Sequence, residues 1–106
     1  MGAQNISDAA KASTMAKAYE KCVAEALHES GINAYNGTIS TTNGFIEKTA
    51  LYESLVKEHG KEKGLSKWYE EGWEHTEKWE EVWGALIETH GDSNEGTYVF
   101  VGWASV

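Results

Sequence analysis

The stretch Thr97-Tyr98-Val99-Phe100-Val101-Gly102-Trp103-Ala104 decides the fold class, because its β-branched and aromatic residues are typical of a strand. A second apolar stretch, Trp83-Gly84-Ala85-Leu86-Ile87-Glu88-Thr89-His90, precedes it along the chain. Between the two lies Gly91-Asp92-Ser93-Asn94-Glu95-Gly96, a polar segment with glycine at each end. Two such stretches joined by a polar loop predict a β-hairpin.

Two helices are predicted immediately before the hairpin. Apolar residues repeat at helical spacing over residues 46–59, and Gly60 marks the end of that helix. Ser66 is a suitable N-cap for the next helix, which is predicted over residues 66–81. Gly72 lies in its middle, where glycine is about 1 kcal/mol less favourable than alanine, so we expect a kink or close packing there.

A further helix is predicted over residues 7–29, near the start of the chain. Ser7 is a suitable N-cap, the apolar residues recur at three- and four-residue spacing from Ala12 onward, and Gly31 suits the C-terminal cap. Residues 38–41 follow as a short predicted strand between two Asn-Gly turn signals.

These elements predict one α+β domain over residues 1–106, in the order α-β-α-α-β-β. We expect a small antiparallel sheet, including the C-terminal hairpin, packed against the helices. A chain of this length can bury one hydrophobic core without disulfides or metals. The predicted core consists of Met15, Tyr19, Val23, Leu27, Ile39, Leu51, Leu55, Leu86, Ile87, Val99 and Val101.

The charge balance bears on the class of partner. Seventeen acidic residues face nine lysines, the chain has no arginine, and the net charge is −8. Nucleic-acid binding needs clustered positive charge, so we expect no direct DNA or RNA ligand. An acidic surface suits a protein partner with a basic surface. Cys22 is the single cysteine and no apolar run is long enough to span a membrane, so we expect a cytoplasmic protein.

The acidic third helix is the first candidate site. Glu70, Glu74 and Glu77 are spaced to form a negative stripe on adjoining turns, with Trp73 beside them. We expect a partner-binding surface here, in which an exposed tryptophan supplies apolar contact and the carboxylates steer a basic partner. Like charges lower helix stability, and a feature with that cost and no structural return indicates function.

The same helix carries Glu71 and His75, side chains of the kind that bind Zn²⁺ or Mn²⁺. It lacks the second histidine of a His-Glu-x-x-His motif, and a solvated acidic face accounts for the carboxylates without a metal. We therefore expect no metal and no cofactor. No residue is assigned a catalytic role, because Cys22 lies on the apolar face of its helix, where it is expected to be an inert, buried side chain.

The polar segment over residues 35–44 is an alternative site. Its hydroxyl groups and glycines could hold a phosphate or a ribose through backbone N–H groups, although neither the P-loop nor the dinucleotide-binding pattern is present. In that alternative the ligand is bound by Tyr35, Asn36, Thr38, Ser40 and Thr41.

The segment from Ala18 to Phe45 also carries a resemblance. Its helix, followed by Tyr35-Asn36-Gly37-Thr38-Ile39, resembles small uncharacterised proteins of tailed bacteriophages, in which a Tyr-x-Gly-Thr-Ile strand follows an N-terminal helix. The closing Phe100-Val101-Gly102-Trp103-Ala104 is similar to their final strand. The resemblance implies a viral accessory protein that acts in the cytoplasm of a bacterial host.

The leading functional hypothesis is a small acidic accessory protein of the phage type, binding rather than catalytic, that captures and inhibits a host or defence protein. Two alternatives stay open. One is a small-molecule or nucleotide-binding protein or hydrolase that uses residues 35–44. The other is a structural subunit that forms homo-oligomers through exposed aromatic residues.

Overall fold

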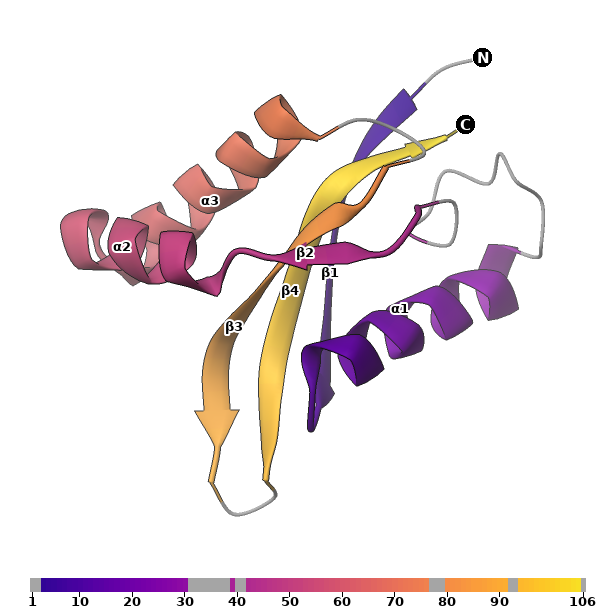
Figure 1. The fold of residues 1–106 in the computed structure, drawn as a ribbon, viewed down its shortest axis with the longest axis horizontal. Coiled ribbons are helices and arrows are strands. Elements are labelled where there is room, and N and C mark those ends of the chain that lie inside the picture. The colour runs from indigo at the N-terminus through magenta and orange to yellow at the C-terminus, as the bar shows by residue number, and fades with distance from the viewer. Residues whose placement is uncertain (1–2, 31–38, 40–41, 77–79, 92–93, 106) are drawn as a thin grey trace.

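The computed structural model describes residues 3–30, 39, 42–76, 80–91 and 94–105 of the chain. These described residues form three helices and a four-stranded sheet, which confirms the α+β class (Figure 1). None of the described helices is long and apolar enough to cross a membrane. The elements in chain order are β1 (Ala3–Ala12), α1 (Met15–Ser30), β2 (Phe45–Glu47), α2 (Thr49–His59), α3 (Lys61–His75), β3 (Val82–His90) and β4 (Glu95–Ser105).

The strand order in the sheet is β1-β4-β3-β2. β4 pairs antiparallel with β3, which confirms the predicted hairpin, and it pairs antiparallel with β1 along its other side. β2 pairs parallel with β3, so the expectation of a purely antiparallel sheet is wrong. The chain reaches this parallel register because α2 and α3 form the crossover between β2 and β3.

Helices cover both faces of the sheet. α1 lies on one face, whereas α2 and α3 lie on the other (Figure 1). Successive side chains of a strand point to opposite faces, so Phe100 is buried on the α1 side and Val101 on the α2–α3 side. The sheet therefore separates two hydrophobic clusters, and β3 and β4 contribute to both.

The start of the chain differs from the predicted helix over residues 7–29. Residues 3–12 form β1, and α1 begins only at Met15. The alanine-rich segment has good helix propensity, but pairing with β4 over ten positions outweighs this local preference. The Lys17 N–H donates to Thr14 Oγ1 (3.2 Å), so Thr14 is the N-cap and Ser7 is not.

The middle of the chain also differs in its boundaries. The strand predicted over residues 38–41 lies outside the described residues except for Ile39, which is buried but belongs to none of the four strands. The short strand is β2 instead, so the helix predicted from residue 46 begins only at Thr49. It ends at His59, as predicted.

Gly60 joins α2 directly to α3. Its φ of 91° lies in the left-handed region that favours glycine. This backbone conformation lets α3 begin at Lys61, whereas the sequence predicted that this helix begins after an N-cap at Ser66. At the other end, α3 stops at His75 instead of running to residue 81. Thr76 is extended, and its hydroxyl donates to the Gly72 carbonyl (2.7 Å), which satisfies a backbone group of the last turn.

The core differs from the predicted set mainly in its aromatic residues. Trp68 is 0% exposed, and its indole N–H donates to the Lys48 carbonyl (3.2 Å), so a polar atom is buried with a partner. Phe100 is also fully buried. Leu27, by contrast, is 37% exposed, which corrects its assignment to the core.

Candidate functional site

The position of α3 on the sheet fixes which of its residues face outward. Trp68 is buried beneath the helix, and the backbone at Gly72 lies so close to β4 that a Cβ atom there would collide with Val101. The close packing expected at Gly72 is therefore confirmed, because only a residue without a side chain allows so close an approach. The opposite face of α3 is left to solvent.

The predicted acidic stripe is present in part. Glu70 and Glu74 are both exposed, and their four-residue spacing places them on neighbouring turns of the outward face. Glu77 lies outside the described residues, and α3 ends at His75. The helical part of the stripe therefore consists of two carboxylates rather than three.

Trp73, expected beside these glutamates as a source of apolar contact, is exposed only in part. It is half-buried, its indole N–H donates to the Ile6 carbonyl of β1 (3.0 Å), and its ring stacks on Tyr69 with centroids 5.9 Å apart. The Trp103 indole in turn donates to the Trp73 carbonyl (2.6 Å). Trp73 thus ties α3 to β1 and β4, and part of its surface remains accessible beside Glu70.

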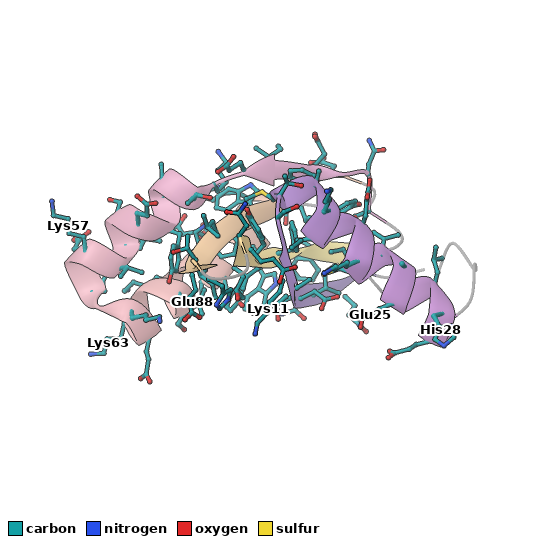
Figure 2. The ribbon with its side chains drawn as sticks, turned by 90° about the horizontal axis from the view of Figure 1, so that it is seen from below. Lys11, Glu25, His28, Lys57, Lys63 and Glu88 are labelled. Atoms are coloured by element: carbon teal, nitrogen blue, oxygen red, sulfur yellow. The ribbon has the colours of Figure 1, made fainter. Side chains whose placement is uncertain are left out.

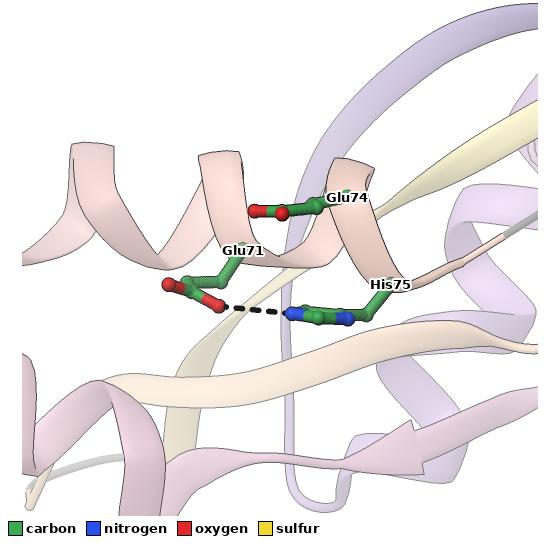
Figure 3. A group of neighbouring side chains, drawn as sticks. All are labelled: Glu71, Glu74 and His75. Atoms are coloured by element: carbon green, nitrogen blue, oxygen red, sulfur yellow. Dashed lines mark ion pairs between the residues drawn. The ribbon is translucent and has the colours of Figure 1, made fainter.

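Glu71, Glu74 and His75 bring their side-chain ligand atoms within 4.8 Å of one another (Figure 3). The Nε2 atom of His75 lies 3.2 Å from Oε2 of Glu71, and these side chains are 54% and 46% exposed. The His75 imidazole also stacks on Trp83 with centroids 6.0 Å apart. Within the described residues, no other group of three such donors lies this close.

The chemistry open to this group is that of a solvated ion pair. Protonated His75 can pair with Glu71 at a separation of four residues on one helix, which stabilises the helix by a few tenths of a kcal/mol at most. A divalent cation would accept these donor types. Three exposed side chains from one helix would, however, leave much of its coordination shell to water.

The described residues include only part of the alternative site over residues 35–44. Tyr35, Asn36, Thr38, Ser40 and Thr41 all lie outside the described residues, so this site stays a prediction. The described end of the segment is anchored to α1. The Tyr19 hydroxyl lies 2.6 Å from Thr42 Oγ1 and accepts the Gly44 N–H at 3.0 Å.

A second acidic group lies at β1 and α1. Burial raises the pKa of the Asp8 carboxyl, and repulsion from Glu25 and Glu29 adds to the rise, while a hydrogen bond from the Ala9 N–H opposes it. Cys22 is buried beside this group, and burial raises the pKa of its thiol to about 12, with smaller contributions from Asp8 and Glu25. The thiol is therefore protonated and unreactive at neutral pH.

No local sequence pattern marks this second group, because the helix predicted over residues 7–29 contains both Asp8 and Glu25. Only the reversal of chain direction between β1 and α1 brings the carboxylates together.

The other feature that sequence analysis missed is a pocket of about 200 Å³ at the tip of the β3–β4 hairpin. Its lining includes Ser13, His90, Asn94 and Glu95, and His90 Nε2 lies 2.8 Å from Thr97 Oγ1. These residues come from the two ends of the hairpin and from the turn before α1, which no local pattern links.

Comparison with protein-family models, with curated proteins and with solved structures finds no match to this chain.

Proposed function

We propose that this protein is a binding protein that captures a basic surface of another protein through the outward face of α3. The observation that carries the proposal is the exposure of Glu70 and Glu74 on a helix whose inner face is fixed to the sheet. The indole groups of Trp68 and Trp73 donate hydrogen bonds to the backbone of Lys48 and Ile6, which holds α3 in a fixed position. The helix therefore loses little conformational entropy when a partner binds.

Electrostatic steering is the expected role of the two glutamates. Carboxylates on a protein with a net charge of −8 attract a positively charged partner over long range and raise the association rate. The accessible part of Trp73 supplies apolar contact beside them. Association is expected to slow as the salt concentration rises, because exposed charges are screened within about 10 Å at 0.1 M ionic strength.

The identity of the partner is a wider hypothesis. The resemblance of the Ala18–Phe45 segment to small phage proteins supports a host or defence protein of a bacterium as the target, with inhibition as the result. Acidic character without arginine supports a target that itself has a basic surface, such as a nucleic-acid-binding enzyme.

The test is capture of a partner from bacterial lysate, followed by affinity measurement with that purified partner. The variant Glu70→Lys/Glu74→Lys is expected to lose at least about tenfold in affinity, because two attractive charges become repulsive. The matched control is Glu20→Lys/Glu53→Lys, which changes two exposed glutamates on α1 and α2 and alters the net charge equally.

The control variant should retain most of the affinity, and both variants should keep the far-UV circular dichroism spectrum of the original protein. Equal affinity of the α3 variant and the unaltered protein would show that the outward face of α3 is not the interface. Equal losses in both variants would mean that net charge alone, and not this face, governs binding.

A further inference from the structure

The outward face of α3 carries four charged residues in a single stripe. Lys63, Lys67, Glu70 and Glu74 are all exposed, and they follow one another at spacings of four, three and four residues. At about 100° per residue, their positions on the helix fall within an arc of about 60°, away from the buried Trp68. These four residues are called the α3 stripe below.

The charges of the α3 stripe change sign once along the helix. Lys63 and Lys67 make its first half basic, and Glu70 and Glu74 make its second half acidic. The point midway between Lys67 and Glu70 is also midway between Lys63 and Glu74. A second stripe turned by 180° about an axis through this point would therefore place a lysine opposite a glutamate at all four positions.

The charges of the α3 stripe are not already paired within the chain. Among the described residues, the structure shows no ion pair or hydrogen bond from these four side chains. Figure 2 shows Lys63 at the end of the molecule that α2 and α3 form, with its side chain directed away from the ribbon. Glu74 takes no part in the ion pair drawn in Figure 3. The stripe is therefore open to a partner.

The other charges of α3 do not cancel this pattern. Lys61 and Glu62 are adjacent residues of opposite sign in the first turn. Glu71 is paired with His75 (3.2 Å), whose ring stacks on Trp83 of β3. The two halves of the stripe therefore keep their opposite signs.

This order of charges is unfavourable for a helix on its own. The start of a helix favours acidic side chains and its end favours basic ones, whereas Lys63 lies in the first turn and Glu74 in the last. Each half of the stripe also places like charges four residues apart, where they repel each other. Within the stripe only the spacing from Lys67 to Glu70 is favourable. A pattern with this cost is expected where a partner supplies the opposite charges.

We propose that the α3 stripe binds the same stripe of a second copy of this chain, with the two helices antiparallel across a two-fold axis. Lys63 of each copy then meets Glu74 of the other, and Lys67 meets Glu70, so the interface is self-complementary. The inference rests on the proposed function, because it uses the same two glutamates, and it names a second copy as a basic surface that they bind. Another protein with a basic surface would compete with the second copy.

The dimer is expected to be weak and sensitive to salt. Exposed ion pairs contribute little individually, and the net charge of −8 on each copy opposes association at long range. At about 0.15 M ionic strength the Debye length is about 8 Å, so this repulsion is screened more than ion pairs in contact. We therefore expect association at roughly 0.1–1 mM protein, and its loss at about 1 M salt.

The first measurement is sedimentation equilibrium of the full chain at up to about 1 mM protein and about 0.15 M salt. The average mass of the original protein should rise toward that of a dimer. Lys63→Glu/Lys67→Glu, the acidic-stripe variant, and Glu70→Lys/Glu74→Lys, the basic-stripe variant, should each lower the association constant at least about tenfold, because each stripe then has one sign. Both variants should keep the far-UV circular dichroism spectrum.

Mixing the two variants tests whether the stripes meet each other. The acidic-stripe and basic-stripe variants should form heterodimers with about the affinity of the original protein, because opposite charges again face each other. NMR shifts of α3 amides in the isotope-labelled basic-stripe variant detect them.

The matched control is Glu20→Lys/Glu53→Lys, which has the net charge of the basic-stripe variant but an unaltered stripe. Alone, this control should associate at least as tightly as the original protein. Mixed with the acidic-stripe variant, it should form heterodimers at least about tenfold more weakly than the basic-stripe variant does, because half of its stripe then meets like charge.

Three results would overturn the dimer: a chain that stays monomeric at about 1 mM, stripe variants that associate as the original protein does, or a mixture without heterodimers. Failure of the dimer is distinguishable from failure of the proposed function. The acidic-stripe variant retains Glu70 and Glu74, so it should still capture a basic partner from lysate whether or not the original protein dimerises.

Discussion

At Gly72 the backbone of α3 lies against Val101, which is fully buried in β4. Two effects of opposite sign meet at this position. Helix propensity favours alanine over glycine by about 1 kcal/mol. An extra methyl group forced into a well-packed core costs about 1–3 kcal/mol. The collision is with the side chain of a central strand, so we expect packing to outweigh propensity.

Gly72→Ala should therefore lower the free energy of unfolding by up to about 2 kcal/mol, as measured by urea denaturation. The double variant Gly72→Ala/Val101→Ala should show favourable coupling, because the smaller side chain makes room for the added methyl group. Ser66→Ala is the matched control at an exposed position of α3, where only propensity acts and stability should rise slightly. A Gly72→Ala protein more stable than the original would contradict the close approach of helix and sheet.

Asp8 gives a second prediction at this scale, through pH. Its folded-state pKa is raised, chiefly by burial, so between the unfolded and folded pKa values the folded protein binds more protons. The free energy of unfolding therefore falls as pH rises through this window, and ionised Asp8 destabilises the fold at neutral pH. Asp8→Asn removes the charge and can still accept the Ala9 N–H.

Asp8→Asn should raise the stability at pH 7 by up to about 0.5 kcal/mol, the scale of a surface substitution. The gain should vanish near pH 3, roughly, where the Asp8 carboxyl is protonated in both states. Thermal denaturation of both proteins across this pH range measures the difference. A wild-type protein that is more stable than the variant at neutral pH would show that Asp8 makes a favourable interaction that outweighs the repulsion.

At the scale of elements, the β3–β4 hairpin was predictable because its signals are local. Two apolar stretches rich in β-branched and aromatic residues, with a glycine-bounded loop between them, specify both strands within a single stretch of chain. β1 was not predictable in this way. Its alanine-rich sequence favours a helix, and only pairing with β4, which lies more than eighty residues further along the chain, makes it a strand.

The features of the candidate site likewise differ in whether they depend on local sequence or on distant parts of the chain. The exposure of Glu70 and Glu74 follows from helical spacing, which the sequence reveals. The partial burial of Trp73 accompanies its hydrogen bond to the Ile6 carbonyl of β1, and the sequence does not show that a strand lies there. The group of Asp8, Glu25 and Glu29 was missed for the same reason, since it exists only when β1 and α1 fold back on each other.

At the scale of the whole molecule, helices bury both faces of the sheet, so partners meet either outer helix faces or sheet edges. The proposed surface is of the first kind, the outward face of α3. Trp73 joins α3 to the sheet, because it belongs to α3 and donates to the backbone of β1.

The overall charge yields the last prediction, which concerns duplex DNA. Binding to phosphate gains free energy when clustered cations release counterions, and this chain sets nine lysines and no arginine against seventeen acidic residues. We expect a dissociation constant weaker than about 10⁻⁴ M at roughly 150 mM salt, the weak limit of non-specific binding. Fluorescence anisotropy of a labelled duplex measures it.

Glu70→Lys/Glu74→Lys and Glu20→Lys/Glu53→Lys serve as matched charge variants in the same titration, since each changes the net charge from −8 by four units to −4. If long-range repulsion excludes DNA, both variants should bind slightly better than the original protein at low salt, and to the same extent. Sub-micromolar binding by the unaltered protein at about 150 mM salt would contradict the charge argument. It would require the lysines to be gathered on one face, away from the carboxylates of α1 and α3.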